Sequence, residues 1–171
     1  SELDRLLIQV IEYQPSPEVC LRTLYGSVLS SYTNPVRVYT DGACLHNGTP
    51  HARAGAGIFF GLDSPLNASF RVTGKQTNNR GELLAVLMAL SVARPDRDLD
   101  IFTDSLYTIR SLTEWAPSHA DQGWLCDNGD IMADIAAWIR FRTAPLVFHH
   151  VKGHSGNASN DAADDLAKRG A

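Results

Sequence analysis

Residues 36–74 show the alternation of apolar and polar positions that is typical of β-strands. The stretch VRVYTD over 36–41 alternates with a period of two up to Asp41, and the glycine that follows completes a dipeptide common in turns. We therefore expect a strand that ends on Asp41. Two further stretches, GAGIFFG over 55–61 and NASFRVTG over 67–74, predict strands joined to the first by turns.

The second half of the chain alternates between helix-like and strand-like stretches. The segment NNRGELLAVLMALSVA over 78–93 is apolar nearly all round, which predicts a buried helix. It is followed by a predicted strand over 98–104, helices over 105–115 and 130–141, a strand over 146–151 and a helix over 158–170. The order β-β-β-α-β-α-α-β-α predicts an α/β fold with a mixed five-stranded sheet. In such a sheet, three antiparallel strands are followed by parallel αβ units, with helices on both faces.

Residues 1–35 differ from this pattern. The stretch LDRLLIQVIEY over 3–13 has helical spacing, QPSP interrupts it over 14–17, and Pro35 stops the segment that follows. We interpret residues 1–35 as an N-terminal appendage or tether and residues 36–171 as the domain proper. A chain of 171 residues that is 44% hydrophobic has room for one domain with a sizeable core.

Composition and charge narrow the class of protein. No apolar run approaches the roughly 18 residues of a membrane span, and the N-terminus lacks the pattern of a secretory signal. The cysteines Cys20, Cys44 and Cys126 are widely spaced and odd in number, which suggests neither a metal knuckle nor a disulfide framework. We expect a monomeric intracellular protein, cytoplasmic or nuclear, with no membrane partner. The formal charge of −4 argues against nucleic-acid binding by bulk basicity, although it says nothing about one face.

Four acidic residues stand at or near the ends of predicted elements, and each has an ordinary explanation. Asp41 could make a turn, Asp104 could cap the next helix, and Glu82 could stabilise the first turn of the buried helix. Asp164 could pair with Lys168 one helical turn later. Taken together, however, two strand ends and two helices can bring all four acids to one edge of the sheet, where open α/β sheets place their sites.

A cluster of four carboxylates is stable only when cations neutralise it. Like charges in close contact raise one another's pKa values, and bound divalent ions remove this repulsion. Ligand sets made only of oxygen favour Mg²⁺ or Mn²⁺ over zinc. Two such ions about 4 Å apart suit in-line attack of water on a phosphodiester.

Four separated motifs resemble, in order and spacing, those of type 1 ribonuclease H. They are YTDGAC over 39–44, KQTNNRGEL over 75–83, FTDSLYTI over 102–109 and VKGHSGNASNDAADDLAKRG over 151–170. The resemblance spans residues 36–171, about four fifths of the chain. It implies the same fold and an endonuclease that uses two Mg²⁺ ions, or Mn²⁺ instead, to hydrolyse the RNA strand of RNA/DNA hybrids, leaving 3′-hydroxyl and 5′-phosphate ends.

The resemblance also implies roles for individual residues. The catalytic and metal-binding carboxylates would be Asp41, Glu82, Asp104 and Asp164. His154, on the loop GHSG, would assist product release or proton transfer; the alternative is an ordinary polar loop residue. His149 and His150 alternate along a strand, so both cannot join His154 in one site, and we interpret them as structural.

Substrate contacts follow from the same motifs. Recognition of RNA needs groups that reach the 2′-hydroxyl, and cleavage independent of sequence needs contacts to the backbone and minor groove. Residues at family positions that face the RNA ribose groups are Asn47, Asn78 and Asn79. Residues that resemble the pocket for a DNA-strand phosphate are Lys75, Thr77 and Asn128. The alternative for these polar residues is a role in turns.

Two aromatic residues match family positions that line a channel for the DNA strand. Tyr107 and Trp115 are eight residues apart, which on one helix places them on about the same face. An aromatic pair at this spacing is more often part of a core. Trp115, near the predicted helix end, is the better candidate for stacking on a sugar or base.

One segment departs from the family pattern. Many cellular members carry a basic protrusion where this chain has APSHADQGWLCDNGD over 116–130, which holds no Lys or Arg and three Asp. Because each phosphate contact adds affinity and salt dependence, we expect weak intrinsic affinity for hybrids and a modest salt effect.

Three other functions deserve comparison. The domain could belong to a retroelement reverse transcriptase, with residues 1–35 as its tether to a polymerase partner. A binding module that keeps the fold without the chemistry is disfavoured because all four acids are present. A nucleotide-binding oxidoreductase would depend on GAGIFFG, but this spacing is not G-x-G-x-x-G and no helix follows it.

Overall fold

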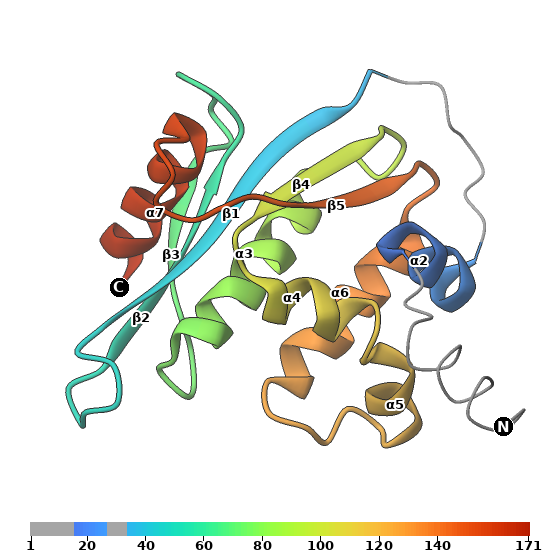
Figure 1. Cartoon of the computed structure of the whole chain (residues 1–171), viewed down its shortest axis with the longest axis horizontal. Helices are drawn as coiled ribbons and strands as arrows, with labels where there is room; N and C mark the ends of the chain where they lie inside the picture. The colour runs from blue at the N-terminus through green and yellow to red at the C-terminus, as the bar shows by residue number, and fades with distance from the viewer. Residues whose placement is uncertain (1–15, 27–33) are drawn as a thin grey trace, which may run out of the picture.

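The computed structural model describes residues 16–26 and 34–171, and the helix expected over 3–13 lies outside them. A five-stranded sheet with the order β3-β2-β1-β4-β5 is flanked by helices (Figure 1). The strands are β1 (Val36–Leu45), β2 (Arg53–Phe59), β3 (Ala68–Arg71), β4 (Leu99–Thr103) and β5 (Leu146–His150). The helices are α2 (Pro17–Tyr25), α3 (Asn78–Val92), α4 (Leu106–Leu112), α5 (Ala116–Asp121), α6 (Gly129–Phe141) and α7 (Ala158–Gly170).

The sheet is mixed, as the sequence predicts. Strands β1, β2 and β3 pair antiparallel in chain order. Strand β4 pairs parallel with β1, and β5 pairs parallel with β4. This arrangement confirms three antiparallel strands followed by parallel αβ units. Helix α5 is an addition, because the sequence pattern predicts no separate element over 116–121.

Strand β1 is longer than the sequence predicts. It pairs with β4 over Val36–Tyr39 and with β2 over Tyr39–Leu45, so its backbone stays extended through Asp41. The prediction that the strand ends on Asp41 is therefore wrong. The reason is that the ladder to β2 continues, with Gly42 opposite Ala56, after the pairing with β4 has stopped, and this tertiary pairing overrides the turn preference of Asp-Gly.

Two helices pack on opposite faces of the sheet through close contacts at glycines. A Cβ at Gly42 would lie 2.3 Å from the backbone N of Glu82 in α3, and a Cβ at Gly57 would lie 2.3 Å from the backbone O of Ala163 in α7. Gly57 pairs with Asp41, the neighbour of Gly42, and adjacent positions of a strand point to opposite faces. Helices therefore cover both faces, which confirms the predicted layering (Figure 1).

The glycines of GAGIFFG serve this helix packing. A Cβ at Gly55 would lie 2.2 Å from the backbone O of Ala167 in α7. The strand that carries these glycines begins at Arg53, two residues before the predicted start. Their small size lets α7 lie directly on β2, and they take no part in a nucleotide-binding turn.

The hydrophobic core lies between one face of the sheet and the helices α3 and α6. Leu83, Val86 and Leu90 of α3 are at most 2% exposed, and they cluster with Ile101 of β4 and Ile135 of α6. Helix α3 is thus the buried helix that its sequence predicts, and it holds its N-terminal turns rigidly against β1.

Helix α2 packs against this domain. Leu21 is buried in the same core, and the Tyr25 hydroxyl donates to the backbone O of Leu112 at 3.4 Å. The Arg140 Cζ atom lies 5.7 Å from the centre of the Tyr25 ring. Part of the N-terminal region, residues 17–25, therefore contacts the domain that follows it.

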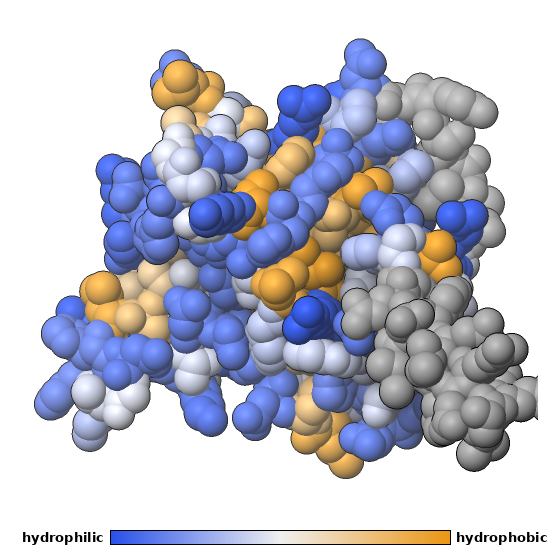
Figure 2. Space-filling view, viewed as in Figure 1, coloured by the Kyte–Doolittle hydropathy of each residue, from blue (hydrophilic) through white to orange (hydrophobic). Residues whose placement is uncertain are grey.

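The surface in the view of Figure 2 is mostly hydrophilic, with hydrophobic residues gathered near its middle over β4 and β5. Within 16–26 and 34–171, the helices are all too short or too polar to cross a membrane.

Candidate metal centre

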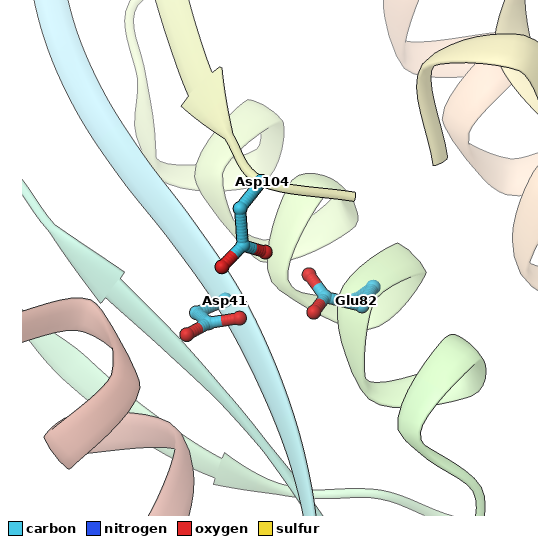
Figure 3. A group of neighbouring side chains, drawn as sticks. All are labelled: Asp41, Glu82 and Asp104. Carbon is cyan, nitrogen blue, oxygen red and sulfur yellow. The ribbon is translucent and has the colours of Figure 1, made fainter. Parts of the chain in front are cut away.

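Three carboxylates from separate elements meet where β1 and β4 part. Asp41 lies within β1, Asp104 follows the last residue of β4, and Glu82 projects from α3 (Figure 3). One carboxylate oxygen of each side chain lies within 4.8 Å of the others. The structure thus brings together three of the four acids that the sequence singles out.

The position of Glu82 excludes a capping role. The N-cap of α3 is Thr77, whose hydroxyl accepts a hydrogen bond from the backbone N of Arg80 at 3.2 Å. Since the helix starts at Asn78, Glu82 is its fifth residue and lies in the second turn, not in the first as predicted. Its carboxylate points to Asp41 and Asp104 instead of to the helix end (Figure 3).

Asp104 is likewise not the cap of the helix that follows it. The N-cap of α4 is Ser105, whose hydroxyl accepts from the backbone N of Thr108 at 3.1 Å. The capping function is therefore filled by a neighbour, and Asp104 is left free to face the other two acids.

The site is electrostatically unfavourable without a cation. The pKa of Asp41 is raised to about 7, mainly by burial and also by the charges of Asp104 and Asp164, although hydrogen bonds from Glu82 and from the backbone N of Gly42 lower it. Burial also raises the pKa of Glu82 well above its usual range, and the charge of Asp41 adds to this. Both side chains are at most 5% exposed. The fold therefore holds two carboxyls where ionisation is costly.

The residues fit a hard divalent cation. The Glu82 Oε2 atom is buried and has no hydrogen-bond partner in the described part of the chain. A cation would satisfy this oxygen and cancel the repulsion between the carboxylates. All donors are oxygens, which is the ligand set that Mg²⁺ and Mn²⁺ favour.

Asp164 lies near this group but outside it. Its carboxylate accepts from the Lys168 Nζ atom at 2.6 Å, the i,i+4 pair that the sequence allows. It is nevertheless close enough for its charge to raise the pKa of Asp41. A role of Asp164 as a fourth ligand stays a prediction.

The loop that carries His154 passes beside the cluster. A Cβ at Gly153 would lie 2.7 Å from the Asp104 Oδ2 atom, so the loop backbone approaches this carboxylate closely. His154 follows directly, is exposed and has a φ of 52°. The sequence analysis did not identify Gly153, although a glycine before a loop histidine is the signal for such an approach.

Most of the polar residues assigned to substrate lie at or just before the start of α3, and Asn47 lies on another loop. Asn78 and Asn79 are exposed in its first turn, and Lys75 is exposed just before it. Asn47 is exposed on the loop between β1 and β2. Asn47 thus lies in a turn, as the alternative to substrate binding expects. Asn78 and Asn79 lie at a helix N-terminus, where backbone amides favour the binding of anions.

A hydrogen-bond network joins α3 to the start of α6. Asn128, at a φ of 62°, donates through Nδ2 to the Tyr107 hydroxyl at 3.0 Å. The Arg80 Nη1 atom is 3.5 Å from Asn128 Oδ1, and the same guanidinium binds both Asp130 oxygens at 2.8 and 2.7 Å. This arginine, which the sequence analysis did not single out, fixes Asn128 relative to Thr77 at the helix start.

The two aromatic residues touch but do not share a helix. Helix α4 ends at Leu112, and Trp115 is the N-cap of α5, so the prediction that Tyr107 and Trp115 lie on one helix is wrong. The Thr113 hydroxyl bonds the backbone O of Ile109 as α4 ends there, which the apolar spacing does not reveal. The rings make an edge contact at 6.3 Å between centres, with Tyr107 packed against the core and Trp115 38% exposed.

The adjacent histidines lie on β5. His149 stacks on Phe102 with ring centres 4.5 Å apart, and its Nε2 atom is 3.5 Å from an oxygen of Asp100. These contacts with β4 agree with a structural role for His149. His150, the last residue of the strand, is exposed.

The strand order and the carboxylate cluster together define the ribonuclease H fold with its acidic site. The RNase H family model matches residues 33–171, and the chain belongs to this family.

Similar proteins support the type 1 branch of the family. The chain is 36% identical over 142 residues to Ribonuclease H1 of Rattus norvegicus, which covers 80% of this chain and 50% of that protein. It is 41% identical over 141 residues to Ribonuclease H of Schizosaccharomyces pombe, covering 78% and 52%. It is 33% identical over 146 residues to Ribonuclease H of Orientia tsutsugamushi, which covers 82% of this chain and 85% of that protein. The chain thus spans about half the length of the eukaryotic relatives.

Solved structures agree on the fold. The crystal structure of LC9-RNase H1, described as a type 1 RNase H with the type 2 active-site motif, superposes with a TM-score of 0.60 at 25% identity and covers 81% of this chain and 72% of that one. The solution structure of the PFV RNase H domain gives 0.59 at 24% identity, with 78% and 92% covered. At this identity the viral domain supports the fold alone.

Proposed function

We propose that this protein is a metal-dependent endonuclease that hydrolyses the RNA strand of RNA/DNA hybrids and leaves 3′-hydroxyl and 5′-phosphate ends. The observation that carries the proposal is the cluster of Asp41, Glu82 and Asp104, whose oxygens lie within 4.8 Å of one another. Family membership and the names of the relatives support the same activity.

The carboxylates would hold two Mg²⁺ ions, with Mn²⁺ as an alternative. Because the pKa values of Asp41 and Glu82 are raised, a cation would compete with protons for these carboxyls and would displace them on binding. Asp164 would complete the set once its contact with Lys168 is exchanged for a cation. When bound, such ions activate a water nucleophile and stabilise the leaving oxygen of a phosphodiester.

The chain's own residues would position the hybrid over this cluster. Asn47, Asn78 and Asn79 are exposed and would donate to or accept from ribose hydroxyls of the RNA strand. A phosphate of the DNA strand would be bound by Lys75, Thr77 and Asn128, with Tyr107 holding the Asn128 amide. Trp115 is exposed enough to stack on a sugar or base.

His154 would act after cleavage. Its exposed position, directly after the glycine that touches Asp104, lets its side chain reach a departing product without being a ligand itself. We expect it to assist product release or a proton transfer.

A polymerase partner is a second proposal, which one observation favours. Residues 116–130, which form α5, the loop to α6 and the first residues of α6, hold no Lys or Arg, so the segment supplies no Lys or Arg for phosphate contacts. A partner such as a reverse transcriptase polymerase would supply the missing affinity.

The substrate is tested by cleavage of one end-labelled RNA strand offered single-stranded, in an RNA/RNA duplex and in an RNA/DNA hybrid. Each is incubated with Mg²⁺, Mn²⁺ or EDTA. We expect cutting of the hybrid alone, abolished by EDTA. Cutting of single-stranded RNA, or cutting that survives EDTA, would contradict the proposal.

A further inference from the structure

A cavity of about 480 Å³ lies between α2, the end of α6 and the start of β5. Leu146 in its wall pairs with Leu99, the first residue of β4, whereas Asp104 follows the last. The cavity is therefore at the opposite end of the parallel strands from the carboxylate cluster. Its volume is in the range of sites for small organic ligands.

Most of the charged residues that line this cavity are arginines. Arg22, Arg140 and Arg142 line it together with one acid, Glu18. Among the described residues, none of these arginines has a carboxylate oxygen within 4.0 Å. In a protein with a formal charge of −4, three arginines that form no ion pair with a described residue around one cavity call for a physical reason.

Arg142 is the most informative of the three. It is 9% exposed, and its terminal nitrogens donate to the backbone oxygens of Arg94 and Arg97. Its Nε atom is buried and has no hydrogen-bond partner in the part of the chain described. Burial lowers the pKa of Arg142, although the charges of Asp98 and Asp96 act in the opposite direction. A buried guanidinium neutralised by no contacting carboxylate is costly, and a bound anion would offset this cost.

The rest of the lining is largely apolar and partly aromatic. Tyr25 is fixed by its hydrogen bond to the backbone of Leu112, and Arg140 lies over its ring at 5.7 Å. Leu21 and Ile139 continue the apolar surface between the helices. A ligand that matches this lining has a charged end for the arginines and an apolar body for the rest.

We propose that this cavity binds a phosphate monoester that carries a flat or apolar group, such as a nucleoside monophosphate. Guanidinium groups match phosphate oxygens with paired hydrogen bonds. The lining itself carries three arginines and one glutamate, and this excess of positive charge suits a phosphate dianion better than a single carboxylate. Binding here is independent of the proposed nuclease activity.

The test is calorimetric titration of the whole chain with AMP, adenosine and inorganic phosphate, in EDTA so that the carboxylate cluster holds no metal. We expect AMP to bind, inorganic phosphate to bind more weakly and adenosine not to bind. Equal binding of adenosine and AMP, or no binding of AMP, would overturn the proposal. A 5′-phosphorylated trinucleotide RNA compared with its 5′-hydroxyl form distinguishes a strand end from a free nucleotide as the source of the phosphate.

Variants locate the binding to the cavity. Arg22 and Arg140 are exposed helix residues, so the double variant Arg22→Ala/Arg140→Ala should fold, which its melting curve verifies. We expect it to bind AMP at least about tenfold more weakly. The matched control Arg37→Ala/Arg53→Ala removes the same charge from β1 and β2 and should bind as the unmodified chain does. Equal affinity of the two double variants would overturn the assignment.

Discussion

At the scale of single residues, Asp41 and Glu82 are carboxyls that the fold buries at an electrostatic cost. Burial is the main cause of their raised pKa values, and their mutual repulsion with Asp104 adds to it. Such an arrangement is retained where a cation repays the cost on binding. Stability, pH and metal binding should therefore be linked in a specific direction.

The first prediction concerns this linkage. Asp41 has a folded pKa of about 7 against a reference of 3.8, so the folded state binds protons more tightly between these values. Without metal, the free energy of unfolding should fall as pH rises from about 4 to 7. Mg²⁺ needs ionised carboxylates, so its stabilising effect should grow over the same window. Thermal unfolding at pH 5 to 8, with EDTA or Mg²⁺, measures both trends.

The Asp41→Asn variant checks that these trends arise at the cluster. It should melt higher than the unmodified chain in EDTA at pH 8 and gain little from Mg²⁺. Asp134→Asn, which removes an exposed acid from α6, should behave as the unmodified chain. The linkage would be contradicted if Mg²⁺ raised the melting temperature of Asp41→Asn as much as that of the unmodified chain. It would also be contradicted if Mg²⁺ raised the melting temperature of the unmodified chain equally at pH 5 and pH 8.

At the scale of elements, the site depends on how closely α3 lies on β1. Gly42 follows Asp41 in β1 and contacts the backbone of Glu82 in α3. This close contact sets the position of Glu82 relative to Asp41. A second link, between Arg80 and Asp130, joins α3 to α6 and holds the network around Asn128.

The substitution Gly42→Ala tests the first link. Its Cβ would meet backbone atoms of Glu82 at 2.3 Å and of Gly81 at 2.6 Å, so α3 must move. We expect a loss of about 1–3 kcal/mol in the free energy of unfolding and weaker Mg²⁺ binding. Gly48→Ala is the control, because nothing lies within 4 Å of its Cβ and only its φ of 76° opposes the change. Equal Mg²⁺ affinity of Gly42→Ala and the unmodified chain would show that this contact does not position Glu82.

Asp130→Asn tests the second link. The hydrogen bond from Arg80 lowers the pKa of Asp130 to about 2, so the pair contributes stability above about pH 4 that is lost as pH falls towards 2. The loss at pH 7 should be about 1 kcal/mol, because the Asp130 side chain is 67% exposed. Denaturant unfolding at pH 2 to 7 should show the two proteins converging in acid. A constant difference at all pH values would contradict an ionic contribution.

The same two elements show how far sequence reasoning reaches. Acids at the ends of predicted strands pointed to Asp41 and Asp104 because parallel strands share an edge, and the structure brings these acids together with Glu82. The sequence suggested a turn at Gly42, whereas in the structure backbone atoms of α3 occupy the space beside it. Local pattern cannot show which helix crosses a strand, nor that Arg80 finds a partner fifty residues later in Asp130.

At the scale of the whole molecule, charge is the feature that separates this chain from a basic nucleic-acid binder. Its formal charge is −4, and residues 116–130 hold no Lys or Arg. Cations bound at the acidic cluster would lower the repulsion of phosphate locally. Affinity for a hybrid should therefore depend on few phosphate contacts.

The salt dependence of binding measures the number of such contacts. In Ca²⁺, fluorescence anisotropy of a labelled hybrid over a range of KCl concentrations should give weak affinity and a shallow slope. We expect the logarithm of the binding constant to fall with a slope equivalent to about three phosphates or fewer. A slope equivalent to six or more would show that other cations of the chain replace the missing basic segment.

The central claim is that the buried carboxylate cluster carries out metal-dependent cleavage. The most direct measurement is the initial rate of RNA cleavage in an RNA/DNA hybrid by the unmodified chain, Asp41→Asn and Asp134→Asn, each in Mg²⁺. The account predicts that Asp41→Asn remains folded and loses at least about a thousandfold in rate, while Asp134→Asn retains the full rate. Cleavage by a folded Asp41→Asn protein at an undiminished rate would contradict it.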